Sequence, residues 1–491
     1  MPISIVLEKA RQNGLAVSGL TFRSQDVRPG AVFFALKGAN ADGNLFIDDA
    51  LARGAGMIVS CVDPVKPCPV LYYRSEDIDR DMADAAYEFY GRPSDAMAMW
   101  GITGTKGKTS IAYLLESVLT AAGRKVGALG TVNYRIAGRV VCAAPNTTPA
   151  ALVLFGLLAQ MKAERCDGVV MEVSSHALEL QRVRHIWYDT AIFTNLQRDH
   201  LDFHHTFENY FKAKQKLFEN LADPHNPKPR RTAVINADDP YGRRLLEMLK
   251  GRVRTVTFAV DGEADFKAAD IRESLTHTSF TVNGVPARIN LLGRHNVYNA
   301  LAAYAAARAG GVEEKYIVQG LKNLPGVPGR MERVNEGQDY FVFVDFAYTD
   351  ESLQRAFKTV EPFKKGRVLV VFGCGGQRDR TKRPLMGRTA CTHADRVFLT
   401  NDNPRCEDEK QIFNDILEGM KGFSNYEIVP DRAEAIRRAL AAAQKDDIVI
   451  IAGKGHEDYQ IVGTEKRHFS DRETVRAFLC GEKNLCSEKK N

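Results

Sequence analysis

The feature that most constrains this chain is a glycine-rich stretch between an apolar run and a segment of good helix formers. It reads Gly101-Ile-Thr-Gly104-Thr-Lys-Gly107-Lys108-Thr109-Ser, with the apolar run at 97–100 and the helical segment at 111–115. This order predicts a phosphate-binding loop, because glycines let backbone N–H groups surround phosphate oxygens. Lys108 would neutralise the β- and γ-phosphates, and the Thr109 hydroxyl would bind Mg²⁺. Ile102 replaces the first glycine of the common GxxxxGK[ST] form, so the loop is not of the usual GTPase type. The alternative is a glycine turn that binds nothing.

Length and composition are typical of a multidomain globular protein. A chain of 491 residues is too long to fold around a single hydrophobic core. Of its residues, 44% are hydrophobic and 26% are charged, as in ordinary globular proteins. The net charge of +6 is small and basic residues alternate with acidic ones, so no nucleic-acid partner is expected. Nine cysteines without a CxxC pair argue against disulfides and zinc, and favour a reducing cytosol. The sequence shows no signal peptide and no apolar run that could cross a bilayer, so we expect a cytoplasmic protein without a membrane partner.

Turn-forming residues divide the chain into three blocks. The first ends near Pro93, and the second ends at the Pro- and Gly-rich segment 324–329. In the second and third blocks strand-like runs alternate with helical stretches, which predicts an α/β fold with parallel sheets covered by helices. Ligands of such sheets bind at the carboxyl ends of the strands. Polar residues follow six of the predicted strands, at Glu172, Asn195, Asn236, Asp345, 401–403 and 453–457.

Two polar groups close to the predicted loop could bind a hard cation. Glu172 begins the run Glu-Val-Ser-Ser-His at one strand end, and His200 follows the next strand. Carboxylate oxygens bind Mg²⁺ readily, whereas imidazole is a less usual ligand. Taken alone, Glu172 would more often be a helix cap or a salt-bridged acid, and His200 a buried hydrogen-bonded imidazole. Their position beside a phosphate loop favours the metal interpretation.

A polar corner in the third block could bind an amino acid. In Asp402-Asn403-Pro-Arg405 the guanidinium can bind a carboxylate through two parallel hydrogen bonds, and the aspartate can bind an ammonium. The glycine turn Gly453-Lys-Gly-His-Glu457 adds a second acid. The alternative is an Asn-Pro turn with a surface arginine. Lys214 lies on an amphipathic helical stretch, and nothing in the local pattern marks it.

Together these motifs resemble the Mur ligases, cytoplasmic ATP-dependent enzymes that form amide bonds in peptidoglycan synthesis. The resemblance covers essentially the whole chain. It rests on the stretches 104–109, 146–149, 172–176, 194–200, 296–299, 373–376, 382–386, 402–405 and 453–457.

The resemblance implies three domains and one reaction. A UDP-binding domain would span 1–95, a central ATP-binding domain with a mostly parallel sheet 96–326, and a Rossmann-like amino-acid-binding domain 327–491. A monomer would add meso-diaminopimelate to UDP-N-acetylmuramoyl-L-alanyl-D-glutamate. ATP would phosphorylate the substrate carboxylate, and the incoming amine would displace phosphate from the acyl phosphate.

The resemblance also implies which residues bind the nucleotide and the metal. Lys214 matches a lysine that is carbamylated in the family: CO₂ adds to its neutral amine, and the resulting anion suits Mg²⁺. Mg²⁺ would be bound by Thr109, Glu172, His200 and carbamylated Lys214. The catalytic residues would be Lys108, Glu172, His200 and Lys214. ATP would be bound by Gly104, Thr105, Lys106, Gly107, Lys108, Thr109, Ser110, Asn296, Arg330 and Asp345.

Substrate contacts follow from the same resemblance. Ser24 would contact the uridine side of the nucleotide sugar. Asp402 and Glu457 would bind the distal amino group of the amino acid, and Arg383 and Arg405 its carboxylates. Asn403 and Gly453 belong to the same pocket. The muramoyl dipeptide would be bound by Asn146, Thr147, Thr148, Ser174 and Arg182.

Arg405 favours diaminopimelate over L-lysine. The resemblance implies that Asp-Asn-Pro-Arg marks diaminopimelate-adding members, whereas lysine-adding members usually lack this arginine. Diaminopimelate carries a far carboxylate that the guanidinium would pair with, and the same cation would repel the ammonium of lysine. The alternatives are L-lysine addition, a folylpolyglutamate synthetase, or a catalytically inactive scaffold that binds UDP-sugars.

Several positions depart from the family pattern, among them the following four. Gln25 stands where the family usually has arginine, and Tyr348 stands where it has histidine and cannot carry the imidazole charge. Gln377 replaces a common aspartate, and Leu180 replaces a frequent glutamine. None of the four is a predicted phosphate or Mg²⁺ ligand, so we expect activity to survive.

Overall fold

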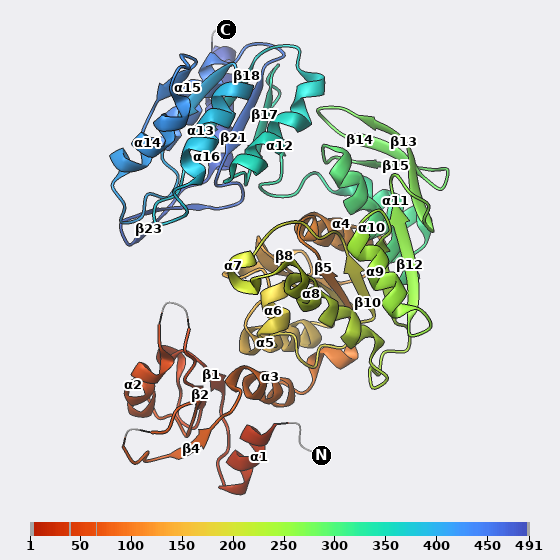
Figure 1. Cartoon of the computed structure of the whole chain (residues 1–491), viewed down its shortest axis with the longest axis vertical. Helices are drawn as coiled ribbons and strands as arrows, with labels where there is room; N and C mark the ends of the chain where they lie inside the picture. Colours follow the sequence, from red (N-terminus) through yellow and green to blue (C-terminus); the bar gives the residue numbers. More distant parts are fainter. Residues whose placement is uncertain (1–3, 39–40, 65, 489–491) are drawn as a thin grey trace. The chain divides into compact units, whose positions relative to one another are not determined.

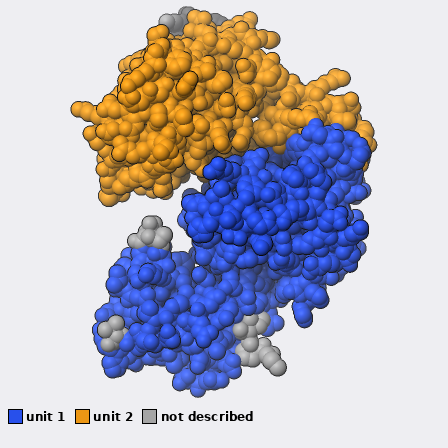
Figure 2. Space-filling model, in the orientation of Figure 1, with its two compact units in different colours: residues 1–268, 298–321 blue, residues 269–297, 322–491 orange. Residues whose placement is uncertain are grey.

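The computed structural model describes residues 4–38, 41–64 and 66–488, and the chain divides into two compact units (Figure 2). Unit 1 comprises residues 1–268 and 298–321, and unit 2 comprises residues 269–297 and 322–491. Each unit has its own hydrophobic core of buried aliphatic and aromatic side chains. Within the described ranges, no helix is long and apolar enough to cross a membrane.

A small parallel sheet of unit 1 lies within the first 95 residues, with strand order β1-β2-β3-β4. Its inner strands, β2 and β3, are fully buried runs of apolar residues. Helix α3 begins where the Asp77 carboxylate accepts a hydrogen bond from the Arg80 N–H at 3.0 Å, a usual N-cap. The elements are α1 (Ile5–Gln12), β1 (Leu20–Thr21), β2 (Val32–Phe34), α2 (Ile47–Ala52), β3 (Met57–Ser60), β4 (Leu71–Arg74) and α3 (Ile78–Phe89).

The larger sheet of unit 1 has the order β13-β12-β11-β10-β5-β9-β6-β7-β8, and only its β6-β7-β8 edge is antiparallel. Its central strands are buried, as continuous apolar runs of parallel strands should be. The strands are β5 (Ala98–Thr103), β6 (Val126–Leu129), β7 (Asn133–Ile136), β8 (Arg139–Ala143), β9 (Gly168–Glu172), β10 (Thr190–Phe193), β11 (Thr232–Asn236), β12 (Arg254–Ala259) and β13 (Phe266–Glu273).

Helices cover this sheet, and two of them position the candidate site (Figure 1). Helix α4 follows β5 and packs against β6 and β9, while α8 packs against β5, β10 and β11. The carboxyl ends of β5, β9 and β10 therefore lie between the two helices that carry Lys108 and Lys214. The helices are α4 (Lys108–Ala121), α5 (Ala151–Ala163), α6 (Ser175–Glu179), α7 (Leu201–His204), α8 (Phe207–Ala222), α9 (Pro240–Leu249), α10 (Arg294–Ala309) and α11 (Glu314–Asn323).

Unit 2 contains a sheet with the order β16-β17-β21-β18-β19-β20, in which only β16 is antiparallel. Alternate strand residues pack against α12, α13 and α14 on one face and against α15 and α16 on the other. The elements are β14 (Thr278–Val282), β15 (Val285–Ile289), β16 (Glu332–Val334), β17 (Phe341–Asp345), α12 (Asp350–Val360), β18 (Val368–Phe372), α13 (Lys382–His393), β19 (Arg396–Leu399), α14 (Glu409–Leu417), β20 (Tyr426–Ile428), α15 (Arg432–Ala442), β21 (Ile448–Ala452), β22 (Tyr459–Val462), β23 (Glu465–His468) and α16 (Asp471–Glu488).

The predicted α/β fold is confirmed, since parallel sheets in both units are covered by helices. The predicted strand–turn–helix order at the glycine-rich stretch is confirmed by β5, the turn and α4. The domain boundaries at 95/96 and 326/327 stay predictions.

Candidate active site

The glycine-rich turn of unit 1 requires glycine at two positions. Gly104 has φ +141° and Gly107 has φ +92°, a region that L side chains rarely adopt. A Cβ atom on Gly104 would overlap the Thr194 hydroxyl, and one on Gly107 would overlap the Asn299 carboxamide. The turn thus packs too closely against its surroundings for any larger residue.

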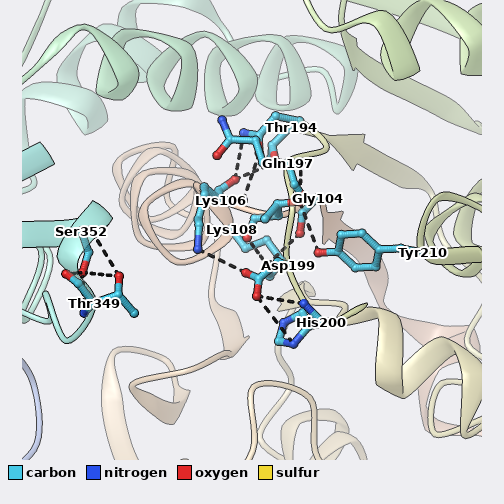
Figure 3. Close-up of polar contacts among 12 residues, drawn as sticks. Gly104, Lys106, Lys108, Thr194, Gln197, Asp199, His200, Tyr210, Thr349 and Ser352 are labelled. Atoms are coloured by element: carbon cyan, nitrogen blue, oxygen red, sulfur yellow. Dashed lines mark hydrogen bonds and ion pairs between the residues drawn. The ribbon is translucent and has the colours of Figure 1, made fainter. Parts of the chain in front are cut away.

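The segment after β10 holds this turn in place (Figure 3). The Thr194 hydroxyl donates to the Lys106 carbonyl at 2.7 Å, and the Lys106 N–H donates to the Asn195 Oδ1 atom at 3.0 Å. The Lys106 ammonium pairs with Asp199 at 3.2 Å. The Thr105 hydroxyl accepts from the Gln197 N–H at 2.9 Å. The turn is therefore held in a fixed shape before any ligand binds, with the N–H groups of Thr105 and Lys106 themselves bound to Asn195.

Two lysine amines meet at one carbonyl of the turn. The Nζ atoms of Lys108 and Lys214 donate to the Gly104 carbonyl at 2.8 and 3.0 Å. Lys214 is 1% exposed, and its Nζ lies 4.4 Å from the centroid of the Tyr210 ring. Burial, reinforced by the nearby Lys108 ammonium, holds the pKa of Lys214 well below its ordinary value. The surroundings of Lys214 therefore favour a neutral amine.

Glu172, at the end of β9, lies beside the start of α4. Its carboxylate accepts hydrogen bonds from the Thr109 hydroxyl at 3.1 Å, from the Thr131 hydroxyl at 3.0 Å and from the Thr131 N–H at 2.9 Å. The Thr131 hydroxyl also contacts the Thr147 hydroxyl at 3.1 Å. The structure thus unites Thr109 and Glu172, as predicted, and adds Thr131, which no sequence motif marks.

His200 lies at the start of α7 and has φ +53°. Its Nδ1 atom is 3.9 Å from an Asp199 oxygen, and its ring centroid is 4.9 Å from that of His176. Burial lowers the pKa of His200, so its imidazole favours the neutral form that binds metals.

The donor set at this edge partly fits Mg²⁺. The hydroxyl and carboxylate oxygens of Thr109 and Glu172 are ligands that Mg²⁺ prefers, whereas an ammonium at Lys214 would repel the ion. Among the described residues, no three His, Cys, Asp or Glu side chains are grouped to hold a metal ion by themselves. A cation here needs further oxygens, which a bound phosphate and a carbamate on Lys214 would supply.

The residues predicted to bind the dipeptide lie next to Glu172. The Thr148 hydroxyl donates to the Glu172 carbonyl at 2.8 Å and accepts from the Ser174 N–H at 3.0 Å. The Arg182 guanidinium donates to the Thr148 carbonyl at 3.2 Å. The Asn146 carbonyl accepts from the Tyr134 hydroxyl at 2.6 Å. Ser174 and Arg182, which lie 26 and 34 residues beyond Thr148 in the sequence, are therefore neighbours of the consecutive residues Asn146, Thr147 and Thr148.

A cavity of about 790 Å³ in unit 1 is lined by residues of the first block, including Arg23 and Arg28, and by Asn146 and residues of α5. Ser24 is 7% exposed and is not among the described residues that line this cavity. A hydrogen bond from the Ser24 side chain lowers the pKa of Asp49. Arg23 and Arg28, unlike Ser24, line this cavity.

Three predicted ATP contacts lie in unit 2. Asn296 is 5% exposed, and its amide donates to the Leu292 carbonyl at 2.7 Å. Asp345 ends β17 and accepts from the Met331 N–H at 2.6 Å, and burial raises its pKa to about 6. The Arg330 guanidinium lies 5.5 Å from the centroid of the Phe346 ring.

A second cavity, of about 270 Å³ and wholly within unit 2, gathers the predicted amino-acid residues. The Arg405 guanidinium donates to the Gly376 carbonyl at 2.8 Å, so it is held against the loop after β18. Four lining side chains were not predicted as contacts: Phe346, Tyr348, Arg378 and Lys382. Asp402, Asn403, Arg405, Gly453 and Glu457 all line the cavity.

Arg383 does not line this cavity. Its side chain is 0% exposed, and its terminal nitrogens pair with Glu407 at 2.7 and 2.8 Å and with Asp415 at 2.8 Å. Its buried Nε atom has no hydrogen-bond partner among the described residues. The carboxylate-binding role of Arg383 stays a prediction, and in this structure Arg383 anchors the loop that carries Glu407.

Models of the Mur ligase family match most of the chain: the family's catalytic domain at 16–82, the middle domain at 102–307 and the glutamate ligase domain at 329–455. A UDP-N-acetylmuramoyl-L-alanyl-D-glutamate–2,6-diaminopimelate ligase of Solibacter usitatus is 44% identical over 95% of this chain and 94% of its own. The ligase of the same name from Bacillus cereus is 42% identical over 95% of both chains. The chain therefore belongs to the Mur ligase family of ATP-dependent amide ligases.

Solved structures agree with this assignment. One of a UDP-N-acetylmuramoyl-L-alanyl-D-glutamate–2,6-diaminopimelate ligase is 31% identical, covers 95% of both chains and gives a TM-score of 0.66. A MurF ligase from Thermotoga maritima in complex with ADP is 20% identical, covers 97% of this chain and 99% of its own, and gives a TM-score of 0.61. At that identity the second likeness shows the fold alone.

Proposed function

We propose that this protein adds meso-diaminopimelate to UDP-N-acetylmuramoyl-L-alanyl-D-glutamate with ATP, in the synthesis of the peptidoglycan cell wall. The observation that carries this proposal is the unit 2 cavity, in which Arg405 and two acids, Asp402 and Glu457, line one small space. Separate cationic and anionic groups suit a molecule with both carboxylate and ammonium groups. We further propose that the enzyme acts as a monomer in the cytoplasm.

The turn of unit 1 would bind and activate the nucleotide. Its N–H groups and Lys108 would hold the phosphates, and Asn296, Arg330 and Asp345 the base and ribose. Mg²⁺ at Thr109 and Glu172, with His200 nearby, would neutralise charge on the transferring phosphoryl group. Thr148, Ser174 and Arg182 would present the dipeptide carboxylate beside this edge. The residues then act mainly by positioning the two reacting groups.

Lys214 is proposed to be carbamylated. Its side chain is buried, and the Nζ atoms of Lys108 and Lys214 both donate to the Gly104 carbonyl. An ammonium on Lys214 would therefore lie close to a like charge and have little water around it. Addition of CO₂ to the neutral amine forms an N–C bond and releases one proton, which leaves an anionic carbamate. That anion would pair with Lys108 and supply oxygen to Mg²⁺.

Phosphate release tests the proposed reaction. The purified protein is incubated with ATP, Mg²⁺ and the UDP-linked dipeptide, and either meso-diaminopimelate or L-lysine is added. We expect release with diaminopimelate alone. Arg405→Met should lower kcat/KM for diaminopimelate by at least about 30-fold, because losing one partner of a charge pair typically costs about 2–5 kcal/mol. Arg437→Met, on the exposed face of α15, serves as the control.

Other outcomes would favour the alternatives. Release with L-lysine would keep the ligase and refute the specificity. Release with neither amino acid would favour an inactive UDP-sugar-binding scaffold or a folylpolyglutamate synthetase. The scaffold is disfavoured because Lys108, Thr109, Glu172 and Lys214 are all present and close together.

A further inference from the structure

Lys454 is a buried cation behind the unit 2 cavity. Its side chain is 0% exposed, and its ammonium donates to Asn403 Oδ1 at 3.0 Å, Glu457 Oε2 at 3.3 Å and Asp402 Oδ1 at 3.5 Å. The Asn403 amide also donates to Glu457 at 3.0 Å. One lysine therefore contacts three of the residues that line the cavity, although it does not line the cavity itself.

The three ionic groups form a corner with a single net negative charge. Asp402 and Glu457 contribute two carboxylates, whose side chains are 10% and 18% exposed, and Lys454 neutralises one of them. Arg432 is also a buried cation, but its charge is balanced by Asp471, whose carboxylate lies 2.7 Å from the guanidinium. Within these three groups one negative charge is left for an ammonium group, while Arg378, Lys382 and Arg405 contribute positive charge to the rest of the cavity lining.

We propose, building on the function proposed above, that Lys454 is a positioning residue that sets the charge of this corner and thereby favours diaminopimelate over lysine. The distal carbon of diaminopimelate carries an ammonium and a carboxylate, whereas that of lysine carries only an ammonium. A corner with two unbalanced negative charges would attract the lysine ammonium more strongly and would repel the additional carboxylate of diaminopimelate. Lys454 prevents this and holds both acids in fixed positions.

Charge removal at Lys454 should therefore change selectivity. A unit charge about 6 Å away in an effective dielectric constant of about 20 changes binding by at most about 100-fold. In Lys454→Met we expect the KM for meso-diaminopimelate, divided by the Ki of L-lysine as a competitor, to rise by about 10- to 100-fold. Lys454→Arg keeps the charge and should keep the ratio. Because a merely structural lysine would affect both amino acids alike, the ratio separates the two roles.

Two further variants keep the test decisive if Lys454→Met does not fold. Lys454→Met combined with Glu457→Gln restores a single net negative charge, and its ratio should return towards that of the wild type even if both affinities fall. Asp402→Asn keeps Lys454 and makes the corner neutral, so the ratio should move in the opposite direction.

The outcomes separate this inference from the proposed function. If the wild type turns over diaminopimelate but the ratio stays within about 2-fold in every folded variant, Lys454 does not control selectivity. If the wild type releases no phosphate with diaminopimelate, the proposed function fails and this inference fails with it. A ratio that follows the net charge of the corner supports both.

Discussion

The buried ion pair between Arg432 and Asp471 gives the sharpest prediction about stability. Both side chains are 0% exposed, and the guanidinium donates to the two carboxylate oxygens at 2.7 and 2.8 Å. It also donates to the carbonyls of Ala452 at 2.9 Å and Asn401 at 3.4 Å. In Arg432→Met the Asp471 carboxylate keeps its burial and loses its counter-charge, which typically costs about 3–5 kcal/mol.

Calorimetry and chemical denaturation would measure this loss. We expect the unfolding temperature of the transition that involves unit 2 to fall by about 10 °C, since about 1 kcal/mol shifts such domains by about 2–4 °C. Replacing both residues, Arg432→Met with Asp471→Leu, removes the buried charge and should restore most of the stability. Loss of less than about 1 kcal/mol in the single variant, or a double variant as unstable as the single one, would refute the reasoning.

Three further predictions concern the turn, Lys214 and pH. Gly104→Ala should abolish ATP binding, measured by calorimetry, because its Cβ would overlap Thr194; Gly481→Ala, with open space around it, should bind ATP normally. Lys214→Met should lower the rate of phosphate release at least about 100-fold, while the dipeptide still binds. Lys212→Met, on the exposed side of α8, should leave the rate unchanged. If the two variants are equally active, Lys214 is not catalytic. Hydrogen bonds from Arg383 lower the pKa of Glu407 from 4.5 to about 2. This carboxylate therefore stabilises the fold above pH 4.5 and loses that effect as pH falls towards 2, so the melting temperature should fall less steeply in Glu407→Gln over that range.

Local sequence predicted the turn well because all of its determinants are contiguous. Gly104, Gly107 and Lys108 lie within five residues of one another, and a strand before them and a helix after them follow from short-range preferences. The polar strand ends were also predictable, since parallel strands place their carboxyl ends at one edge of a sheet. Glu172 and the Asp402–Arg405 corner are two such polar strand ends.

The role of Lys214 could not be predicted from the local sequence pattern. Its position on an amphipathic helix resembles that of any solvated lysine, and only the packing of α8 against β5 brings its amine to the Gly104 carbonyl. Thr131 likewise carries no motif, yet it donates twice to Glu172. For Arg383 the family resemblance implied a ligand contact, whereas in the folded chain its side chain pairs with Glu407 and Asp415.

The amino-acid sequence by itself determined the α/β fold, the phosphate-type turn and the membership of the Mur ligase family, because these depend on periodicity and on short contiguous motifs. Only the tertiary structure decided which charges stand together. Lys454 is 52 residues from Asp402 in the chain. The fold buries the Lys454 side chain next to two acids, Asp402 and Glu457. The strength of a charge interaction depends on the distance between the charges and on the exclusion of water around them, and both are set only when the chain folds.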